Sequence, residues 1–386
     1  MKYIHIAEPM VGEEEWKEIW GPISAGWLTQ GPKVKEFEEK FANKHKVKFA
    51  IAVTSCTTAL HLALRALNVG QGDYVVVPSF TWIATANAVE YCGATPIFCD
   101  SDLNTYNIDV EKLEMLLKKM QTGGKHIKAI LPVHLFGLVA DMDPICQLAK
   151  QHGEIAVVED AACAAGAKYH GRFAGGLGNI GCFSFHPRKI ITTGEGGICT
   201  TNDEQLRAKM NILRSHGAVL SEEQRHHSDH PYLMPDFDEL GYNYRMSDLQ
   251  GAMGIVQLDK LDQLIVERRK WANFYDEALS DLSWIIPPTV PTECFHSYQA
   301  YVCRINTKIA HKSRTQIMQE LHEAGIGSRS GTHAVHELGY YARKYQLKKN
   351  DFPVAAELYA NTIALPLHNR MTPDDYGRVV DTLKRI

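Results

Sequence analysis

From residue 46 onward, short runs rich in valine and isoleucine alternate with longer segments of helical spacing. The runs include FAIAVTS, DYVVVPS, AILPVHLFG and EIAVVED, and the segments between them include TTALHLALRALNVG and TWIATANAVEYCG. Such alternation is typical of βαβ units, which build a mostly parallel sheet covered by helices on both faces. Seven of the eleven residues at 57–67 are apolar, so a buried helix is predicted there, with Gly70 available to end it. The predicted fold class is therefore α/β.

The pattern changes after about residue 250. A long helical stretch, LQGAMGIVQLDKLDQLIVERRKW, is followed by the proline-rich turn SWIIPPTVPTECF and then by a shorter mix of strands and helices. A chain of 386 residues has room for two or three domains. We predict a large α/β domain over residues 1–255 and a smaller α+β domain over residues 256–386.

Charge and cysteine content exclude several classes of protein. The chain has 41 Lys and Arg against 45 Asp and Glu, so no basic field for nucleic acid or an anionic membrane is expected. The N-terminus lacks the apolar core of a signal peptide, and no run approaches the roughly 18 apolar residues of a membrane span. Nine cysteines without a CxxC pair are expected to be free thiols. These features favour a cytoplasmic protein that acts on small molecules.

Two residues stand where open parallel sheets place ligands. EIAVVED ends in Asp160, at the expected carboxyl edge of the sheet, and Lys189 follows one more predicted strand in FSFHPRKIITTGEGG. A lysine and an aspartate facing one cleft, near a hydroxyl-rich helix start, suit pyridoxal phosphate (PLP). The lysine would form a Schiff base, the aspartate would keep the pyridine nitrogen protonated, and helix N–H groups would bind phosphate. Taken alone, the same residues also fit a solvated surface lysine and a strand-end cap.

The amino-acid sequences of several motifs favour the PLP site over these alternatives. The chain resembles the DegT/DnrJ/StrS family of sugar aminotransferases, which are PLP enzymes of aspartate-aminotransferase fold type I. The resemblance covers nearly the whole chain, in family order, through GWLTQGPKVKEFEEKF, TSCTTALHLAL, VVPSFTWIATANAV, PVHLFG, VVEDAA, SFHPRK, TGEGG, GYNYRMSDLQGAMG and LPLHNRMTPDDY.

The resemblance implies a fold, a cofactor and a reaction. The fold is a three-layer PLP-binding domain with a mostly parallel sheet, and the assembly is a homodimer with shared active sites. The cofactor is PLP, and the reaction moves an amino group, from L-glutamate, to a keto-sugar. The sugar implied is a nucleotide-linked 4-keto-6-deoxy or 3-keto sugar, used for polysaccharide or secondary-metabolite biosynthesis.

The resemblance also assigns roles to residues around the cofactor. Lys189 becomes the Schiff-base lysine and proton shuttle, and Asp160 becomes the partner of the pyridinium nitrogen. Thr57 and Thr58 match the phosphate-binding start of the first helix, with ordinary N-capping as the alternative role. Two further matches complete the set: Ser184 as a phosphate ligand, and Trp82 as an aromatic ring stacked on the cofactor, with burial in the core as its alternative.

Three other residues are expected at the edge of this site, two of them, Asn243 and Arg245, from the resemblance. Asn243 matches an asparagine that family members donate to the phosphate of the neighbouring subunit. Arg245 is expected either to bind a substrate anion or to form an ion pair at the interface. Glu195 is expected to support the Lys189 loop, with substrate contact as its alternative.

Two segments depart from the family pattern. Cys163 stands where many relatives carry a glutamine, and a thiol is a weak donor for the phenolic oxygen of the cofactor. The segment SRSGTHAVHELGYY (328–341) replaces a proline-rich stretch that contributes to the sugar pocket. Within it, His333 and His336 are the substrate-binding candidates, and no particular sugar is inferred.

Competing functions use the same fold. A PLP sugar dehydratase of this family would carry histidine at the lysine position, and Lys189 argues against it. A silent regulatory or binding paralogue is disfavoured because Lys189, Asp160 and Ser184 are all present. A transaminase of a non-nucleotide keto or phosphorylated substrate stays open.

Three further sequence features have simpler explanations than a functional site. GGLGNIG (175–181) contains GxGxxG, but the following residues are strand-like and not helical, so we predict a loop and no dinucleotide site. The histidines at 226, 227 and 230 lie in a polar segment with no thiolate nearby, so no metal site is predicted. His134 is expected to be a hydrogen-bonded residue at a strand end.

Overall fold

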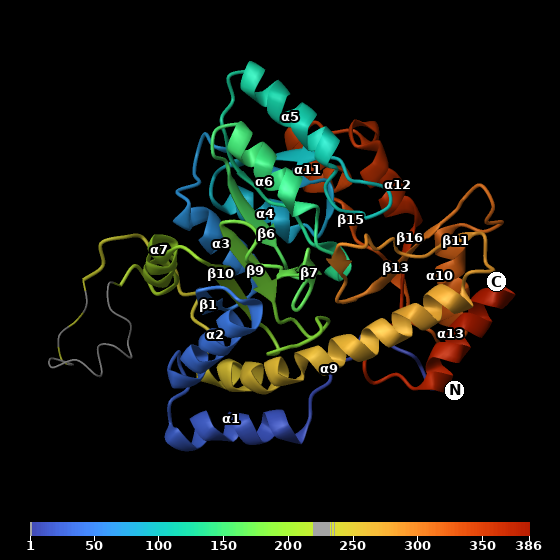
Figure 1. Cartoon of the computed structure of the whole chain (residues 1–386), viewed down its shortest axis with the longest axis horizontal. Helices are drawn as coiled ribbons and strands as arrows, with labels where there is room; N and C mark the ends of the chain where they lie inside the picture. Colours follow the sequence, from blue (N-terminus) through green and yellow to red (C-terminus); the bar gives the residue numbers. More distant parts are fainter. Residues whose placement is uncertain (1, 219–231, 233, 235) are drawn as a thin grey trace.

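A seven-stranded sheet forms the centre of the larger part of the protein (Figure 1). The computed structural model describes residues 2–218, 232, 234 and 236–386. The strand order is β1-β10-β9-β6-β5-β2-β4. All neighbours from β9 to β4 pair in parallel, whereas β10 is antiparallel to both β1 and β9. The predicted α/β class is confirmed. The strands are β1 (Phe49–Val53), β2 (Tyr74–Pro78), β4 (Thr95–Cys99), β5 (Ile127–Ile130), β6 (Ala156–Asp160), β9 (Ile180–Ser184) and β10 (Gly197–Thr201).

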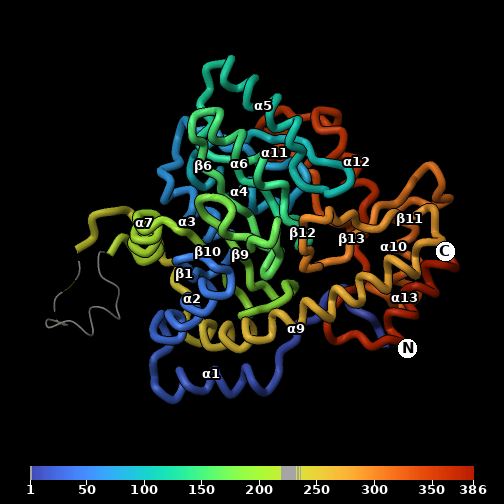
Figure 2. The backbone as a smooth tube through the Cα atoms, in the orientation of Figure 1, coloured from blue at the N-terminus to red at the C-terminus, as the bar shows by residue number. Residues whose placement is uncertain are grey.

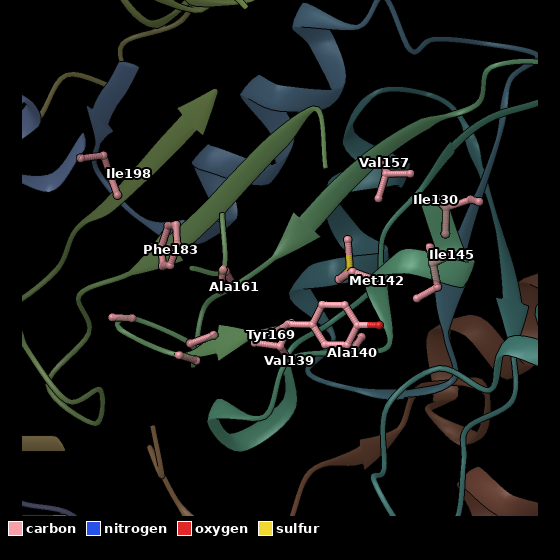
Figure 3. Close-up of a cluster of buried hydrophobic side chains, with 14 of the residues drawn as sticks. Ile130, Val139, Ala140, Met142, Ile145, Val157, Ala161, Tyr169, Phe183 and Ile198 are labelled. Carbon is pink, nitrogen blue, oxygen red and sulfur yellow. The ribbon is translucent and has the colours of Figure 1, made fainter. Parts of the chain in front are cut away.

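Helices cover both faces of this sheet because its strands carry apolar side chains on both sides. One face packs against α2 (Pro32–His45), α5 (Val110–Thr122), α6 (Met142–Gln151) and the first half of α9 (Asp248–Ala278). Figure 3 shows part of this layer, in which Ile130 and Val157 of the sheet lie beside Met142 and Ile145 of α6. The other face packs against α3 (Cys56–Ala66), α4 (Ala84–Tyr91) and α7 (Glu204–Arg214).

Helix α3 begins with a reciprocal cap at the carboxyl end of β1. The side chain of Ser55 accepts a hydrogen bond from the Thr58 amide, and the Thr58 hydroxyl accepts one from the Ser55 amide. Such a capping box satisfies two of the amides that a helix start leaves without partners. The predicted helix over residues 57–67 is thus displaced by one residue.

A second, smaller sheet lies at the other end of the molecule, in the order β11-β13-β16-β14. Its core includes Ala272 and Tyr275 from the second half of α9, together with α10 and α13. Figures 1 and 2 show α9 running along one side of the molecule from the large sheet to the small one, with α1 (Glu13–Ala25) beside its first half. The bounds are β11 (Ile285–Ile286), β13 (Tyr301–Ile305), β14 (Arg329–Ser330), β16 (Thr362–Leu365), α10 (Arg314–Glu323) and α13 (Pro373–Arg385).

The predicted domain boundary at residue 255 falls inside the unbroken helix α9. Its residues pack in the core of the large sheet as far as Ile265 and in the core of the small sheet from Ala272. The division of the chain into residues 1–255 and 256–386 therefore stays a prediction, since one helix belongs to both cores.

A later segment of the chain returns to the large sheet. β15 (His333–Ala334) pairs with β3 (Phe80–Thr81), and Val335 and Tyr341 are buried in the same core as α3 and α4. This return brings the segment 328–341 close to the carboxyl edge of β2. The elements in and after this segment are η2 (Val335–Glu337), α11 (Gly339–Tyr345), η3 (Lys349–Asp351) and α12 (Pro353–Asn361).

A few small elements and general properties complete the description. The remaining elements are η1 (Leu135–Gly137), β7 (Lys168–Tyr169), β8 (Arg172–Phe173) and β12 (Cys294–Phe295). All nine cysteines are free thiols in the structure. Within the described ranges, none of the helices has the length and apolar character needed to cross a bilayer.

Candidate active site

Asp160 and Lys189 come together at the carboxyl edge of the large sheet. Asp160 is the last residue of β6, and in the parallel ladder it pairs with Cys182 of β9. The chain leaves β9 and turns back, so that the Nζ of Lys189 lies 3.1 Å from the Sγ of Cys163, just after Asp160. The Lys189 loop is held by its own backbone and by Gln299, whose side-chain amide donates to the carbonyl of Arg188 at 2.8 Å. Both residues therefore lie at this edge of the sheet.

The carboxylate of Asp160 is buried, with only 5% of the residue exposed. Its Oδ2 accepts a hydrogen bond from the Thr85 hydroxyl at 2.7 Å, and its Oδ1 accepts one from the Ala162 amide at 3.2 Å. Burial raises the pKa of Asp160, and these two neutral donors offset the effect only in part. A buried carboxylate that accepts only these two neutral hydrogen bonds from the described residues is suited to binding a cationic group.

The start of α3 offers a site for a phosphate group. The hydroxyl of Thr57 forms no hydrogen bond with any residue that the structure describes, whereas that of Thr58 is engaged in the cap. Ser184, at the end of β9, pairs with Gly197 of β10. A Cβ on Gly197 would lie 2.4 Å from the backbone of Ser55, so only glycine lets β10 approach the helix start this closely. Thr57 and Ser184 thus lie near the positive end of one helix.

Trp82 lies on the surface of this site and not in the core, since 53% of it is exposed. Its ring lies 5.2 Å from the ring of His333, at an angle of 58°. Thr81, the residue before Trp82, pairs with His333 in the short ladder between β3 and β15. The segment 328–341 therefore lies beside Trp82, and its role in a substrate pocket stays a prediction.

Two other residues predicted for the site, His336 and Glu195, form hydrogen bonds within the protein. His336 is fully buried, with its Nδ1 bonded to the Ser79 hydroxyl and its Nε2 to the Lys349 carbonyl at 3.3 Å. Neither ring nitrogen is left for a substrate, which favours a structural role. The carbonyl of Glu195 accepts hydrogen bonds from Thr193 and Gln250, while 65% of its side chain is exposed. This arrangement favours support of the Lys189 loop.

Asn243 points outward from a rigid base. It lies between Tyr242 and Tyr244, whose rings stack at 4.9 Å and 8°, and the Tyr244 hydroxyl bonds to His61 at 2.9 Å. Asn243 itself is exposed, as a residue that reaches another chain has to be. Arg245 is partly buried and donates to the Ser215 hydroxyl at 3.3 Å, while its Nε has no hydrogen-bond partner among the described residues.

Three residues of the site were not found from the sequence. Thr85 holds Asp160, but a threonine in an apolar helix carries no local signal of that role. His186 and Arg329 lie near Lys189 and Cys163, where their charges affect one another. Arg329 lies in the segment 328–341, which departs from the family pattern. That departure is the sequence signal for a residue near the site.

The comparisons with known proteins bear on this geometry. The sequence profile of the DegT/DnrJ/EryC1/StrS aminotransferase family matches residues 9–384. The chain belongs to this family. The resemblance inferred from the motifs is confirmed, and with it the class of enzyme, an aminotransferase that depends on PLP.

Relatives of this aminotransferase are similar over almost their entire length. GDP-perosamine synthase from Caulobacter vibrioides is 38% identical over 385 residues, covering 99% of this chain and 98% of that protein. The spore coat polysaccharide biosynthesis protein SpsC from Bacillus subtilis is 38% identical over 379 residues, with 98% and 95% coverage. Spr1654 from Streptococcus pneumoniae, assigned as a sugar aminotransferase, is 29% identical in structures of its PMP and PLP forms, with TM-scores of 0.90 and 0.89 and coverage of 99% and 98%.

The donor set in this family member fits PLP, and the cofactor prediction is confirmed. When bound, PLP supplies an aldehyde and a pyridinium ring that withdraws electrons. The protein offers an amine at Lys189, a buried carboxylate with few donors at Asp160, and hydroxyl and amide donors at the start of α3 that have no partners among the described residues. Cys163, which stands where many relatives carry a glutamine, accepts a hydrogen bond from the amine of Lys189.

Behind the site, the glycine-rich loop of the aminotransferase encloses a buried carboxylate. Glu159 accepts hydrogen bonds from His134 at 2.9 Å and from the amides of Gly175, Leu177 and Gly178 at 2.7 to 2.8 Å. The loop prediction for GGLGNIG and the strand-end prediction for His134 are thus both supported by the structure. The histidines at 226, 227 and 230 lie outside the described residues.

This carboxylate is expected to be important for stability. Burial alone would raise the pKa of Glu159, but the hydrogen bonds from His134 and three amides outweigh it and lower the pKa. We expect Glu159→Ala, which leaves those donors buried and unpaired, to cost about 3 kcal/mol of unfolding free energy. Glu154→Ala, at an exposed position just before β6, serves as the control.

The sign of the pH dependence follows from the lowered pKa. The stabilisation by Glu159 is present above its ordinary pKa of 4.5 and is lost as the pH falls toward the lower pKa of the folded protein. Urea titrations of both variants across this range measure it. Equal losses of stability in the two variants would contradict the assignment.

Proposed function

We propose that this protein transfers an amino group from L-glutamate to a nucleotide-linked keto-sugar. The observation that carries the proposal is the contact of Lys189 with the turn after β6, beside the buried carboxylate of Asp160. Support for the sugar comes from relatives named for perosamine and for spore coat polysaccharide, which cover nearly the whole chain. The expected products are amino sugars for polysaccharide biosynthesis.

Each residue of the site has a proposed role. Lys189 would hold the cofactor through its amine and would carry a proton to and from the substrate carbon. Asp160 would keep the ring nitrogen of the cofactor protonated. The positive charge on the ring would favour loss of the proton from the substrate carbon. Thr57, Ser184 and the amides of α3 bind the phosphate, and Trp82 stacks on the ring.

We further propose that two copies of the chain share their active sites. Support comes from Asn243, which is exposed between two stacked tyrosines and whose side chain has no hydrogen-bond partner among the described residues. Sedimentation of the purified protein should give the mass of a dimer. A monomer with full activity would remove the role proposed for Asn243.

The experiment that tests the function is a panel of acceptor sugars. Purified holoenzyme is incubated with L-glutamate and with nucleotide-linked or free keto-sugars, and aminated products are detected by mass spectrometry. An aminated nucleotide sugar, formed together with 2-oxoglutarate and absent with Lys189→Ala, is the expected result. Amination of free or phosphorylated keto-sugars alone would replace the proposed acceptor, and no amination of any sugar would overturn the proposal.

A further inference from the structure

The Asn243 segment, residues 242–245, is held on both sides by backbone contacts. On one side, Asn243 pairs with Ser215 in an antiparallel bridge. On the other side, the Thr54 amide, just after β1, donates a hydrogen bond to the Tyr244 carbonyl at 3.1 Å. The path of the backbone through Asn243 is therefore fixed within its own chain.

The side chains of this segment alternate between two faces. The rings of Tyr242 and Tyr244 stack on each other, and both lie against the ring of His61 on α3, with centroids 4.9 and 5.9 Å away. In an extended backbone, the residue between two such neighbours projects to the opposite face. Asn243 is accordingly exposed, and its side chain has no hydrogen-bond partner among the described residues. The two tyrosines thus hold the segment against α3 and direct Asn243 away from it.

One hydrogen bond joins the side chains at this contact. The Tyr244 hydroxyl and the Nδ1 of His61 are 2.9 Å apart. Only 5% of His61 is exposed, and its Nε2 is buried without a partner in the described part of the chain. Because a hydrogen bond has a preferred direction, it fixes the position of Tyr244 along α3 more closely than ring stacking alone does.

The same contact lies close to the proposed phosphate site of its own chain. His61 comes four residues after Thr57, which places the two on the same side of α3, one turn apart. That site has separate support, because a capping box formed within the first turn holds the start of α3. An effect of Tyr244 is therefore expected at the site that Asn243 would reach and not at the site beside His61.

We propose that Tyr244 and His61 position Asn243 for the cofactor phosphate of the neighbouring subunit, so that a contact on α3 of one chain strengthens cofactor binding in the other. This inference rests on the proposed function, because it takes two copies of the chain to share their active sites. Tyr244 and His61 are positioning residues, since they act through Asn243.

Mixed dimers test in which chain the contact acts. Two differently tagged chains are co-expressed, and one carries Lys189→Ala, so that only the other, reporting chain shows the absorbance of PLP bound to its lysine. The cofactor is removed and PLP is titrated back. With Tyr244→Phe on the Lys189→Ala chain, the Kd for PLP should rise about 3- to 10-fold, the range for loss of one hydrogen bond. With Tyr244→Phe on the reporting chain, the Kd should match that of the mixed dimer without it.

Further variants make the test specific to this contact. Tyr91→Phe is the matched control, because the Tyr91 ring also lies near His61, at 6.1 Å, but its hydroxyl has no partner among the described residues. His61→Asn keeps a polar atom near the position of Nδ1 and should retain more affinity than His61→Leu. With Asn243→Ala on the same chain, Tyr244→Phe should add little, because a positioning residue acts only through the group that it positions.

The result depends on which chain carries Tyr244→Phe. A rise in Kd only when the altered chain is opposite the reporting chain supports the proposal. A rise only on the reporting chain, an equal rise in both arrangements, no change in either, or a chain that forms no dimer would overturn it. Because PLP binding is read without any sugar, a failed acceptor panel would reject the proposed amination and leave this test unaffected.

Discussion

Lys189→Ala protein is expected to be colourless after saturation with PLP and to have a kcat lower by about 10⁴-fold than the wild type. The physical reason is that one amine has two tasks, the covalent bond to the cofactor and the movement of the proton on the substrate carbon. Among the residues that the structure describes, the hydrogen-bond partner of the Lys189 amine is Cys163, so this amine is not held in an ion pair. The absorption spectrum and the steady-state rate with L-glutamate measure the two losses.

Borohydride provides the independent check of the covalent bond. Reduction of PLP-saturated wild type, followed by digestion and mass spectrometry, should find a pyridoxyl group on the peptide of Lys189. Lys384→Ala changes a lysine in the last turn of α13, which packs with the small sheet, and should leave both colour and rate unchanged. A pyridoxyl group found only on other lysines would reject the role of Lys189.

Asp160→Asn is expected to lower kcat by about 10³-fold without unfolding the protein. An amide cannot keep the ring nitrogen of the cofactor protonated, so the ring withdraws electrons less effectively. The geometry accommodates the change, because the Asn oxygen could accept from Ala162 while its amide group donates to the Thr85 hydroxyl. The rate loss would then be electrostatic and not a consequence of misfolding.

Stability provides the matched readout for Asp160. Its raised pKa means that the folded protein holds this proton more tightly than the unfolded chain does, so Asp160 lowers stability as the pH rises above its ordinary pKa of 3.8. At neutral pH the cofactor-free Asp160→Asn protein should therefore be at least as stable as the wild type. The increase in Tm on adding PLP should be smaller than in the wild type. Normal turnover by Asp160→Asn, or a large loss of stability without cofactor, would reject this account.

The sequence anticipated the parts of the site that depend on local pattern. The alternation of apolar runs predicted parallel strands, and parallel strands end at one edge, which places Asp160 and the loop of Lys189 together. The hydroxyl-rich start of α3 likewise predicted a helix cap beside that edge. Neighbours along the chain suffice for such predictions, because strand direction and capping are set by a few adjacent residues.

Other features depend on partners far apart in the chain. His134, Glu159 and the loop around Gly178 become one hydrogen-bonded unit only when β6 lies beside its neighbours, and each alone reads as an ordinary strand or loop residue. The sequence suggested His336 as a substrate ligand. In the structure, the pairing of β15 with β3 buries His336, and its ring is hydrogen-bonded to the Ser79 hydroxyl.

The sequence by itself therefore determined the α/β class and the family, and it proposed the lysine and the aspartate of the site, because local spacing and the motif sequences carry that information. Only the tertiary structure decided which polar groups are satisfied within the protein and which are not. Glu159 is buried among several hydrogen-bond donors, whereas Asp160, the next residue, is buried with few, and Arg329 has no acceptor among the residues that the structure describes. The difference between them is the number of partners that packing brings within hydrogen-bonding distance, and that number is a property of the folded chain.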